Sequence, residues 1–399
     1  MKILHTADWH VDTSRNSRLN PQTGFSFAVE SNFECAKALV DKALEEEVDL
    51  FVLAGDLTTD GSPKPEINLR LAETLEPLNK AGIPVEVDTG NHEKLGIPAR
   101  HRTNVSVVGK MLGNSMNHVI TGVTLSKYDQ FEMLTIPYPS KSRILSELNK
   151  TRVDTTEADA LVVKYVQEQA YRQIENRDES LPLIVAGHFT VSGIGLPGSE
   201  RDVANLFGEA VFPMDFFDDL NPAYVGLGHI HTPQHVGNSR VWYSGSPNKL
   251  TFTDSGDEKG GNLVTIDENT HEYKVDRIPT PVRGMYKFDL SEEGAEIDLD
   301  HYEENDCVQV KLAQGDTELP REIRKEALAR HIGLFPVPNP TQREKTREVM
   351  SAQLDPHTAL TQYLANEGYE DAEVEDVLTR ARLLGIEQDE TTNDEGENA

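Results

Sequence analysis

Five continuous apolar runs, separated by stretches with helical periodicity, are the strongest constraint on how this chain can fold. The runs are KILHTAD, DLFVLAGD, IPVEVDTGN, LPLIVAGH and AYVGLGH. Continuous apolar runs bounded by glycine indicate strands that are buried on both faces, with helices packed outside them. The alternation of strand and helix therefore predicts an α/β core.

The stretches between these runs carry signals for helix ends. SNFECAKALVDKALEEEV fits a capping box, with Ser31 as the N-cap and Glu34 three residues later. The helical stretch PEINLRLAETLEPLNKAG contains Pro77, which predicts a break or an end there. A third helical stretch, DALVVKYVQEQAYRQIEN, precedes the fourth apolar run. After Tyr243 consecutive short strands predict a β-rich edge to the core.

A smaller unit is predicted from about Val282, with strands MYKFDL and DCVQVKLA and the helix PREIRKEALARHIG. Pro336, Pro338 and Pro340 lie close together, which indicates a linker. Two short amphipathic helices follow, and their apolar faces either pack on the chain itself or bind a partner. The polar, acidic end EQDETTNDEGENA is expected to be disordered.

Length and composition narrow the class of protein. A chain of 399 residues indicates two or three units. It has neither an apolar run approaching the roughly 20 residues of a membrane span nor a signal-peptide pattern, so we expect a cytoplasmic protein that does not bind membranes. Cys35 and Cys307 are too few and too far apart for a disulfide framework or a cysteine zinc site. Cys35 lies among apolar helix positions and is expected to be an inert buried thiol.

The formal net charge of −30 is unusual for a protein that binds nucleic acid. Phosphate contacts supply most of the affinity of such proteins, which are usually basic. The charge therefore argues against DNA binding by bulk attraction. It leaves open DNA binding through a local basic patch, through bound metal ions or through a partner chain. Solubility or adaptation to a salty host also accounts for it, and we give that explanation more weight.

Polar side chains that can bind a metal stand at the end of all five apolar runs. In open α/β sheets, ligand sites collect at the carboxyl ends of strands. In D-x-H and H-x-H, residues two apart lie on the same side of an extended chain. Carboxylate, amide and imidazole donors without thiolate suit Mn²⁺, Fe²⁺ or Zn²⁺, and two such ions about 3.5–4 Å apart can clamp a phosphoryl group. A glycine stands directly before four of the candidates, which fits tight turns and close backbone approach. The candidates are Asp8, His10, Asp56, Asn91, His92, His188, His229 and His231.

The ordered series D-x-H, G-D, G-N-H, G-H and G-H-x-H resembles the calcineurin-like metallophosphoesterases. The resemblance implies a two-sheet α/β/β/α sandwich and two divalent ions, with Mn²⁺ expected and Fe²⁺, Zn²⁺ or Mg²⁺ as alternatives. It implies that His92 is catalytic and is not a ligand. The implied ligands are Asp8, His10 and His231 for the first ion, Asn91, His188 and His229 for the second, and Asp56 bridging the two.

YVGLGHIHTPQHV, VWYSGSPNKLTF and DEKGGNLVTID, with the loop GLPGSERD at 195–202, are similar to the SbcD-type DNA double-strand-break repair nucleases of bacteria and phages. The resemblance implies exonuclease action on duplex ends and endonuclease action on single strands or hairpins. It implies an SMC-like ATPase partner of SbcC type and a homodimer within a heterotetramer. The implied parts are a nuclease domain at 1–280, an α+β capping, DNA-binding domain at 281–340, a helical partner-binding region at 341–386 and an acidic tail at 387–399.

Residues next to the motifs receive separate interpretations. Glu93 stands where this group usually has Asp, and we expect its carboxylate to orient His92 through a hydrogen bond. A phosphate contact and a solvated loop are equally open for Arg100 and His101. Three further side chains are interpreted as structural: His5, Trp9 and His235.

Two other functions stay open at this point. The first is another metallophosphoesterase activity, that of a phosphatase or a cyclic-nucleotide phosphodiesterase. The G-S-P segment and the C-terminal extension argue against it. The second is a scaffold protein with little activity, and the complete set of expected ligands argues against that.

Overall fold

The computed structural model describes residues 1–13, 17–93, 104–112, 118–150, 152–194, 209–292 and 294–339. The chain divides into two compact units, Met1–Asn339 and Pro340–Ala399. The helices that we predict within 341–386, and the tail at 387–399, lie outside the described residues. The boundary that we place after residue 280 stays a prediction.

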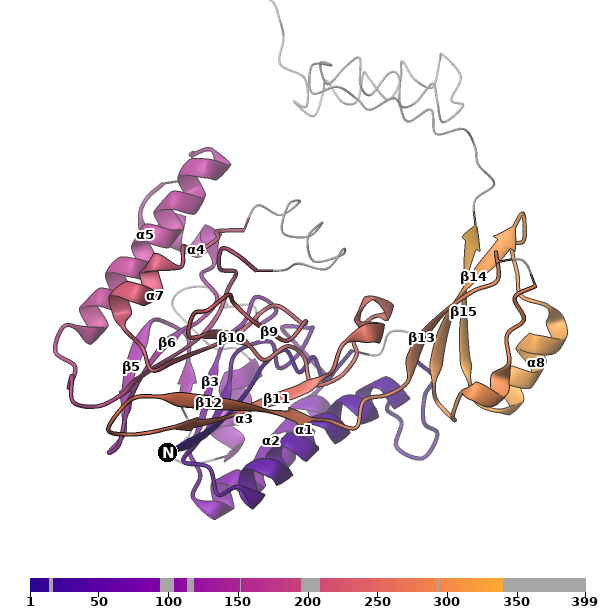
Figure 1. Ribbon diagram of the computed structural model, residues 1–399, viewed down its shortest axis with the longest axis horizontal. Helices are drawn as coiled ribbons and strands as arrows, with labels where there is room; N and C mark the ends of the chain where they lie inside the picture. Colours follow the sequence, from indigo (N-terminus) through magenta and orange to yellow (C-terminus); the bar gives the residue numbers. More distant parts are fainter. Residues whose placement is uncertain are drawn as a thin grey trace, which may run out of the picture. The chain divides into compact units, whose positions relative to one another are not determined.

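A six-stranded sheet forms the first layer, in the order β12-β11-β1-β2-β3-β4 (Figure 1). Its first four strands in sequence pair in parallel, and two antiparallel strands extend one edge. Three helices pack on one face of this sheet through a shared apolar cluster. The strands are β1 (Lys2–Thr6), β2 (Leu50–Leu53), β3 (Val85–Asp88), β4 (His118–Ile120), β11 (Gly260–Ile266) and β12 (Tyr273–Pro279), and the helices are α1 (Phe27–Glu45), α2 (Pro65–Ala81) and α3 (Asn104–Leu112).

A second six-stranded sheet has the order β5-β6-β7-β8-β10-β9. Strands β6, β7 and β8 pair in parallel, and apolar side chains of α4, α5 and α7 pack on this sheet. The strands are β5 (Thr124–Lys127), β6 (Glu132–Ile136), β7 (Leu183–His188), β8 (Tyr224–Gly228), β9 (Gln234–His235) and β10 (Val241–Tyr243), and the helices are α4 (Lys141–Glu147), α5 (Thr155–Ile174) and α7 (Asp215–Leu220).

The two sheets pack face to face through a third apolar cluster. Strand β1 contributes to the apolar clusters on both faces of the first sheet, because successive residues of a strand point to opposite faces. Ile3 lies in the cluster between the sheets, together with Met133 and Ile184 of the second sheet. Leu4 lies in the cluster beneath the helices. The expected α/β/β/α sandwich is confirmed.

Residues 285–339, here called the small sheet unit, contain a three-stranded parallel sheet with the order β13-β14-β15 and the helix α8. Pro336 and Pro338 lie within β15, so the linker that we predict there is wrong. Strand β15 is an edge strand, and proline is tolerated at an edge because it removes no hydrogen bond to a further strand. The elements are β13 (Met285–Asp289), η2 (Leu299–His301), β14 (Cys307–Gln314), α8 (Arg321–Ala329) and β15 (Gly333–Asn339).

Two predictions about helix ends are also wrong. Helix α1 begins at Phe27, and its N-cap is Ser26, whose hydroxyl accepts from the amide of Val29. Ser31 is therefore a buried position inside the helix. Pro77 does not interrupt α2, which continues to Ala81 and ends at Gly82 in the left-handed conformation. The proline removes a single backbone donor, and packing of the apolar face maintains the helix.

Buried side chains away from the site agree with the sequence analysis. The Cys35 thiol is buried, and burial raises its pKa to about 12, so it is an inert thiol. His5 is buried, and its Nδ1 pairs with the Tyr224 hydroxyl at 2.9 Å. Within the described part of the chain, no helix has both the length and the apolar character to cross a bilayer.

His5 yields a prediction about stability and pH. Burial, with a smaller effect of Arg277, lowers the pKa of His5 to about 3. Below the ordinary histidine pKa of about 6.5, the unfolded chain binds a proton that the folded protein does not. The free energy of unfolding should therefore fall as the pH drops from about 6.5 toward 3. His5→Gln should remove about 1.4 kcal/mol of the loss seen by pH 5.5. Urea unfolding of both proteins from pH 8 to 5 measures this, and parallel curves would contradict it.

Candidate metal centre

The carboxyl ends of five strands bring the expected site residues together. Three of these strands belong to the first sheet and two to the second, so the site lies where the ends of both sheets meet. Asp8 and His10 follow β1, Asp56 follows β2, Asn91 and His92 follow β3, His188 ends β7, and His229 and His231 follow β8.

Asp8, His10 and His231 form a first group whose ligand atoms all lie within 4.8 Å of one another. The Nδ1 atom of His10 pairs with the hydroxyl of Thr59 at 3.0 Å. Among the described residues, the buried Nε2 atom of His10 has no hydrogen-bond partner. A buried nitrogen left unpaired in this way costs free energy, and a cation bound there would satisfy it. The first group therefore fits a divalent metal ion.

A second group centres on the amide oxygen of Asn91. This oxygen lies 3.0 Å from Nε2 of His188 and 3.1 Å from Nδ1 of His229. The Oδ2 atom of Asp56 lies 3.3 Å from Nε2 of His188 and 3.6 Å from Nε2 of His10. Asp56 thus reaches both groups, which is the position that a bridging carboxylate requires.

Each histidine of the second group uses one ring nitrogen to contact the protein. Nδ1 of His188 donates to the carbonyl of Ala54 at 2.8 Å, so Nε2 is the nitrogen left for the site. Nε2 of His229 lies 2.7 Å from a carboxylate oxygen of Glu209, so Nδ1 is left for the site. A carboxylate behind a metal-binding imidazole fixes its tautomer and its orientation. Glu209 is not predicted from the sequence, because no local motif surrounds it.

His92 and Glu93 differ from the expectation. The expected hydrogen bond between them is absent among the described residues. Nδ1 of His92 lies 2.8 Å from the carbonyl oxygen of Thr59, so it must be the donor. The Glu93 carboxylate accepts instead from the backbone amides of Gly90, Asp56 and Thr58, at 2.7, 3.0 and 3.3 Å. Glu93 is 1% exposed, and these three backbone amides satisfy its buried oxygen atoms.

The backbone of the site is strained. Asp8, His10, Asp56 and His229 all have a positive φ, between 42° and 88°. This region costs a non-glycine residue of order 1–3 kcal/mol, and such residues concentrate at functional sites. Gly90 is required nearby, because a Cβ there would lie 2.0 Å from Oδ1 of Asp56. The close backbone approach that we predict at the glycine before Asn91 is therefore confirmed.

Burial and nearby charge shift the pKa values of the site's histidines in opposite directions. Burial lowers the pKa of His10 well below its usual value and that of His231 to about 3. Burial acts against charge on His188 as well, but the Asp56 carboxylate outweighs it and raises the pKa of His188 to about 10. The carboxylates of the site therefore favour a positive charge beside Asp56, as expected where a cation binds.

The side chains that we interpret as structural make contacts with other protein side chains. Trp9 is fully buried, and its Nε1 donates to the hydroxyl of Thr6 at 3.0 Å. The His235 ring stacks on Trp242 with centroids 4.2 Å apart. Arg100 and His101, together with the 195–202 loop, lie outside the described residues.

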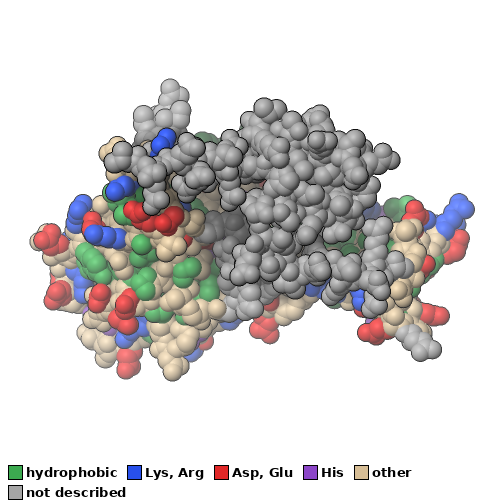
Figure 2. All heavy atoms as spheres, turned by 90° about the horizontal axis from the view of Figure 1, so that it is seen from above, with side chains coloured by type: hydrophobic (Ala, Val, Ile, Leu, Met, Phe, Trp, Pro, Cys, Tyr) green, Lys and Arg blue, Asp and Glu red, His purple; other side chains and the backbone are tan. Residues whose placement is uncertain are grey.

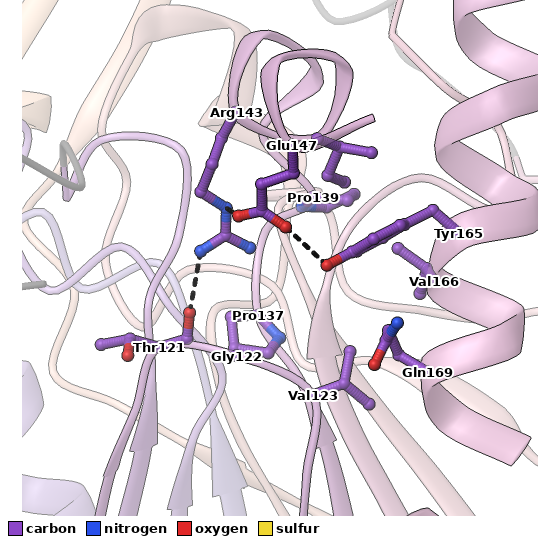
Figure 3. Close-up of a pocket in the computed structure, with 11 residues that line it drawn as sticks. Thr121, Gly122, Val123, Pro137, Pro139, Arg143, Glu147, Tyr165, Val166 and Gln169 are labelled. Atoms are coloured by element: carbon purple, nitrogen blue, oxygen red, sulfur yellow. Dashed lines mark hydrogen bonds and ion pairs between the residues drawn. The ribbon is translucent and has the colours of Figure 1, made fainter. Parts of the chain in front are cut away.

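A separate cavity of about 390 Å³ lies between α4 and α5 (Figure 3). Arg143 donates to the carbonyl of Thr121 at 3.2 Å, and the Tyr165 hydroxyl donates to Glu147 at 2.6 Å. Nε of Arg143 also lies 3.8 Å from the Glu147 carboxylate. The two charges offset each other, and none of the expected ligands lines this cavity. We therefore assign it no part in the metal centre.

Comparisons with known proteins identify a family and several similar proteins. Residues 1–233 match the calcineurin-like phosphoesterase family. A nuclease SbcCD component from Staphylococcus epidermidis, its D chain, is 29% identical over 280 residues, which are 67% of this chain and 67% of that protein. TT1561 of Thermus thermophilus is 15% identical over 69% of this chain and 98% of its own, with a TM-score of 0.37. A dimetal phosphatase from Danio rerio is 12% identical over the same shares, also with a TM-score of 0.37.

The contact behind His229 leads to a prediction. Glu209→Gln should weaken Mn²⁺ binding by about ten- to a hundredfold, because carboxylates behind metal-binding histidines have effects of this size. Isothermal titration with Mn²⁺ measures the change. Glu147→Gln is the matched control. Glu209 accepts from the Tyr138 hydroxyl and Glu147 from the Tyr165 hydroxyl, but in the described part of the chain Glu147 contacts none of the expected ligands. Equal affinities for Glu209→Gln and the unaltered protein would contradict the prediction.

Proposed function

This chain belongs to the calcineurin-like phosphoesterase family, a family of metal-dependent hydrolases, and on that premise we propose that it is a DNA nuclease of SbcD type. It would cut DNA phosphodiester bonds as an exonuclease at duplex ends and as an endonuclease at single strands or hairpins. Its role would lie in DNA repair, recombination or replication. The observation that carries the proposal is the convergence of all seven expected ligands and His92 at one place, in a chain similar to an SbcCD nuclease component.

The proposed ligand sets follow the two groups in the site. Asp8, His10 and His231 would hold one ion. Asn91, His188 and His229 would hold the other, with Asp56 between them. Two bound divalent ions, with Mn²⁺ expected, would supply Lewis acidity toward the phosphoryl oxygens and lower the pKa of the attacking water.

The proposed part of His92 is to assist the leaving oxygen. Its Nδ1–H bond to the Thr59 carbonyl fixes the ring and leaves Nε2 as the nitrogen that can exchange a proton. A histidine held in this tautomer donates from Nε2 when it is doubly protonated and accepts there when it is neutral. The amide of His92 also donates to Oδ1 of Asp56 at 3.0 Å, so the turn that carries His92 is fixed to the proposed bridging residue.

The net charge of −30 bears on how DNA would be held. Figure 2 shows Lys and Arg side chains scattered among Asp and Glu over the described part of one face. Phosphate attraction would therefore come from the metal ions and from a partner. We propose that the partner is an SMC-like ATPase of SbcC type, bound by a homodimer of this chain in a heterotetramer. The 341–386 region is the proposed docking segment.

A nuclease assay tests the proposal directly. The protein with Mn²⁺ should cut duplex ends and hairpins, and an SMC-like ATPase of SbcC type should increase the rate. Chelation of divalent ions should abolish cleavage. Rapid turnover of small phosphate esters or cyclic nucleotides with no cut in DNA, with or without the ATPase, would overturn the nuclease assignment. It would favour a phosphatase or a cyclic-nucleotide phosphodiesterase instead.

Substitution of His92 separates chemistry from metal binding. His92→Ala should reduce DNA cleavage by about 10²- to 10⁴-fold, the usual contribution of general acid–base catalysis, and keep both Mn²⁺ ions. His235→Ala is a control, because that ring stacks on Trp242 and its Nε2 lies 2.6 Å from the carbonyl oxygen of Ser239. Bound manganese, counted after gel filtration, provides the second measurement. Loss of both ions in His92→Ala would contradict the role given to this residue.

A further inference from the structure

One segment, residues 244–259, contacts proposed metal ligands and also the connection that leads into the small sheet unit. It contains the 3-10 helix η1 (Phe252–Gly256). The side chains of Asn248 and Lys259 are buried within it. Neither residue belongs to the site assigned above. Their partners explain why polar groups are buried here.

On one side, the segment holds backbone carbonyls of two proposed ligands of the same ion. The carbonyl of His231 accepts from Nζ of Lys259 at 2.8 Å and from the amide of Ser246 at 3.1 Å. The carbonyl of His10 accepts from Nδ2 of Asn32 at 3.0 Å. Asn32 is buried in α1, and its Oδ1 accepts from Nδ2 of Asn248 at 2.7 Å.

On the other side, the segment contacts the chain that enters the small sheet unit. Oδ1 of Asn248 accepts from the amide of Lys249 at 2.9 Å and from the amide of Arg283 at 3.3 Å. Arg283 lies between β12 and β13, and its Nε donates to the carbonyl of Lys249 at 3.4 Å. Phe252 packs with Met285 of β13, and its ring lies 5.6 Å from that of Phe335 in β15.

The orientation of each amide in this series is fixed by its partners. Backbone N–H groups face Oδ1 of Asn248, so its Nδ2 must point toward Asn32. The carbonyl of His10 only accepts, so Nδ2 of Asn32 must face it. The hydrogen bonds therefore run in one unbroken order, from Arg283 through Asn248 and Asn32 to His10.

We propose that Asn248 is a positioning residue that fixes the backbone of His10 and ties it to the connection with the small sheet unit. The inference rests on the proposed role of His10 as a ligand. Asn248 is fully buried, so a donor or acceptor that loses its partner here cannot turn to water. A change at Arg283 or at Asn248 therefore reaches the ligand through hydrogen bonds, without any contact with the metal.

Substitutions at Asn248 interrupt this series of hydrogen bonds in two different ways. Asn248→Asp keeps an oxygen for the amides of Lys249 and Arg283 but loses the donor toward Asn32. Asn248→Ala loses both sides. Ser31→Ala is the matched control, because the Ser31 hydroxyl also accepts from Nδ2 of Asn248, at 3.1 Å, but does not lead to His10. Asn32→Asp removes the side-chain donor to the His10 carbonyl, which the amide of Thr13 also reaches at 2.9 Å, and supplies a second variant that leaves Asn248 unchanged.

Hydrogen–deuterium exchange of the metal-free protein is the first measurement. In Asn248→Asp and Asn32→Asp, amides within residues 8–13 should exchange on the order of tenfold faster, because a buried hydrogen bond that holds this turn is lost. The amides of Lys249 and Arg283 should stay protected in Asn248→Asp and lose protection in Asn248→Ala. Ser31→Ala should match the unaltered protein throughout.

Titration with Mn²⁺ is the second measurement. One of the two ions should bind about ten- to a hundredfold more weakly to Asn248→Asp, and the other should be little changed. Exchange rates and affinities equal to those of the unaltered protein would overturn the proposal. If the unaltered protein bound no Mn²⁺, the ligand assignment would fail, and the exchange rates alone would decide whether Asn248 positions the His10 backbone.

Discussion

The carboxylate of Glu93 joins the turn after β2 to the turn after β3, and the geometry of the site depends on this contact. It accepts from the amides of Asp56 and Thr58 in one turn and of Gly90 in the other. Burial raises the pKa of Glu93 to about 8, and the amides of Gly90 and Thr58 act against that shift. A buried carboxylate is tolerated only where such donors surround it. Asp56 and Asn91 are consequently held at a fixed separation before any ion binds.

The rest of the site is arranged around this contact at the cost of backbone strain. Four of the site residues have a positive φ, and each such residue costs of order 1–3 kcal/mol. Large apolar clusters on both sides of the sheets and between them offset that cost. A sandwich of two sheets is suited to this purpose, because both sheets present their strand ends at the same edge.

The sequence could predict the parts of this structure that follow from local pattern. Buried strands and the polar residue at the end of each were readable, because they depend on periodicity and on nearby glycine. Contacts between residues that are distant in the sequence cannot be predicted from local pattern. Glu209 lies 20 residues before His229, and Asn248 lies 216 residues after Asn32. The linker predicted at Pro336 is wrong because a proline-rich stretch resembles a linker unless the edge position of its strand is known.

Thr59 holds two residues of the site by different means. Its hydroxyl pairs with His10, and its carbonyl oxygen accepts from His92. A substitution at this position can remove the hydroxyl but leaves the carbonyl in place. The support of His10 is therefore open to mutation, whereas the support of His92 is carried by the main chain and is inherited whatever residue occupies position 59. Sequence drift at this position would be expected to alter metal affinity before it alters proton transfer.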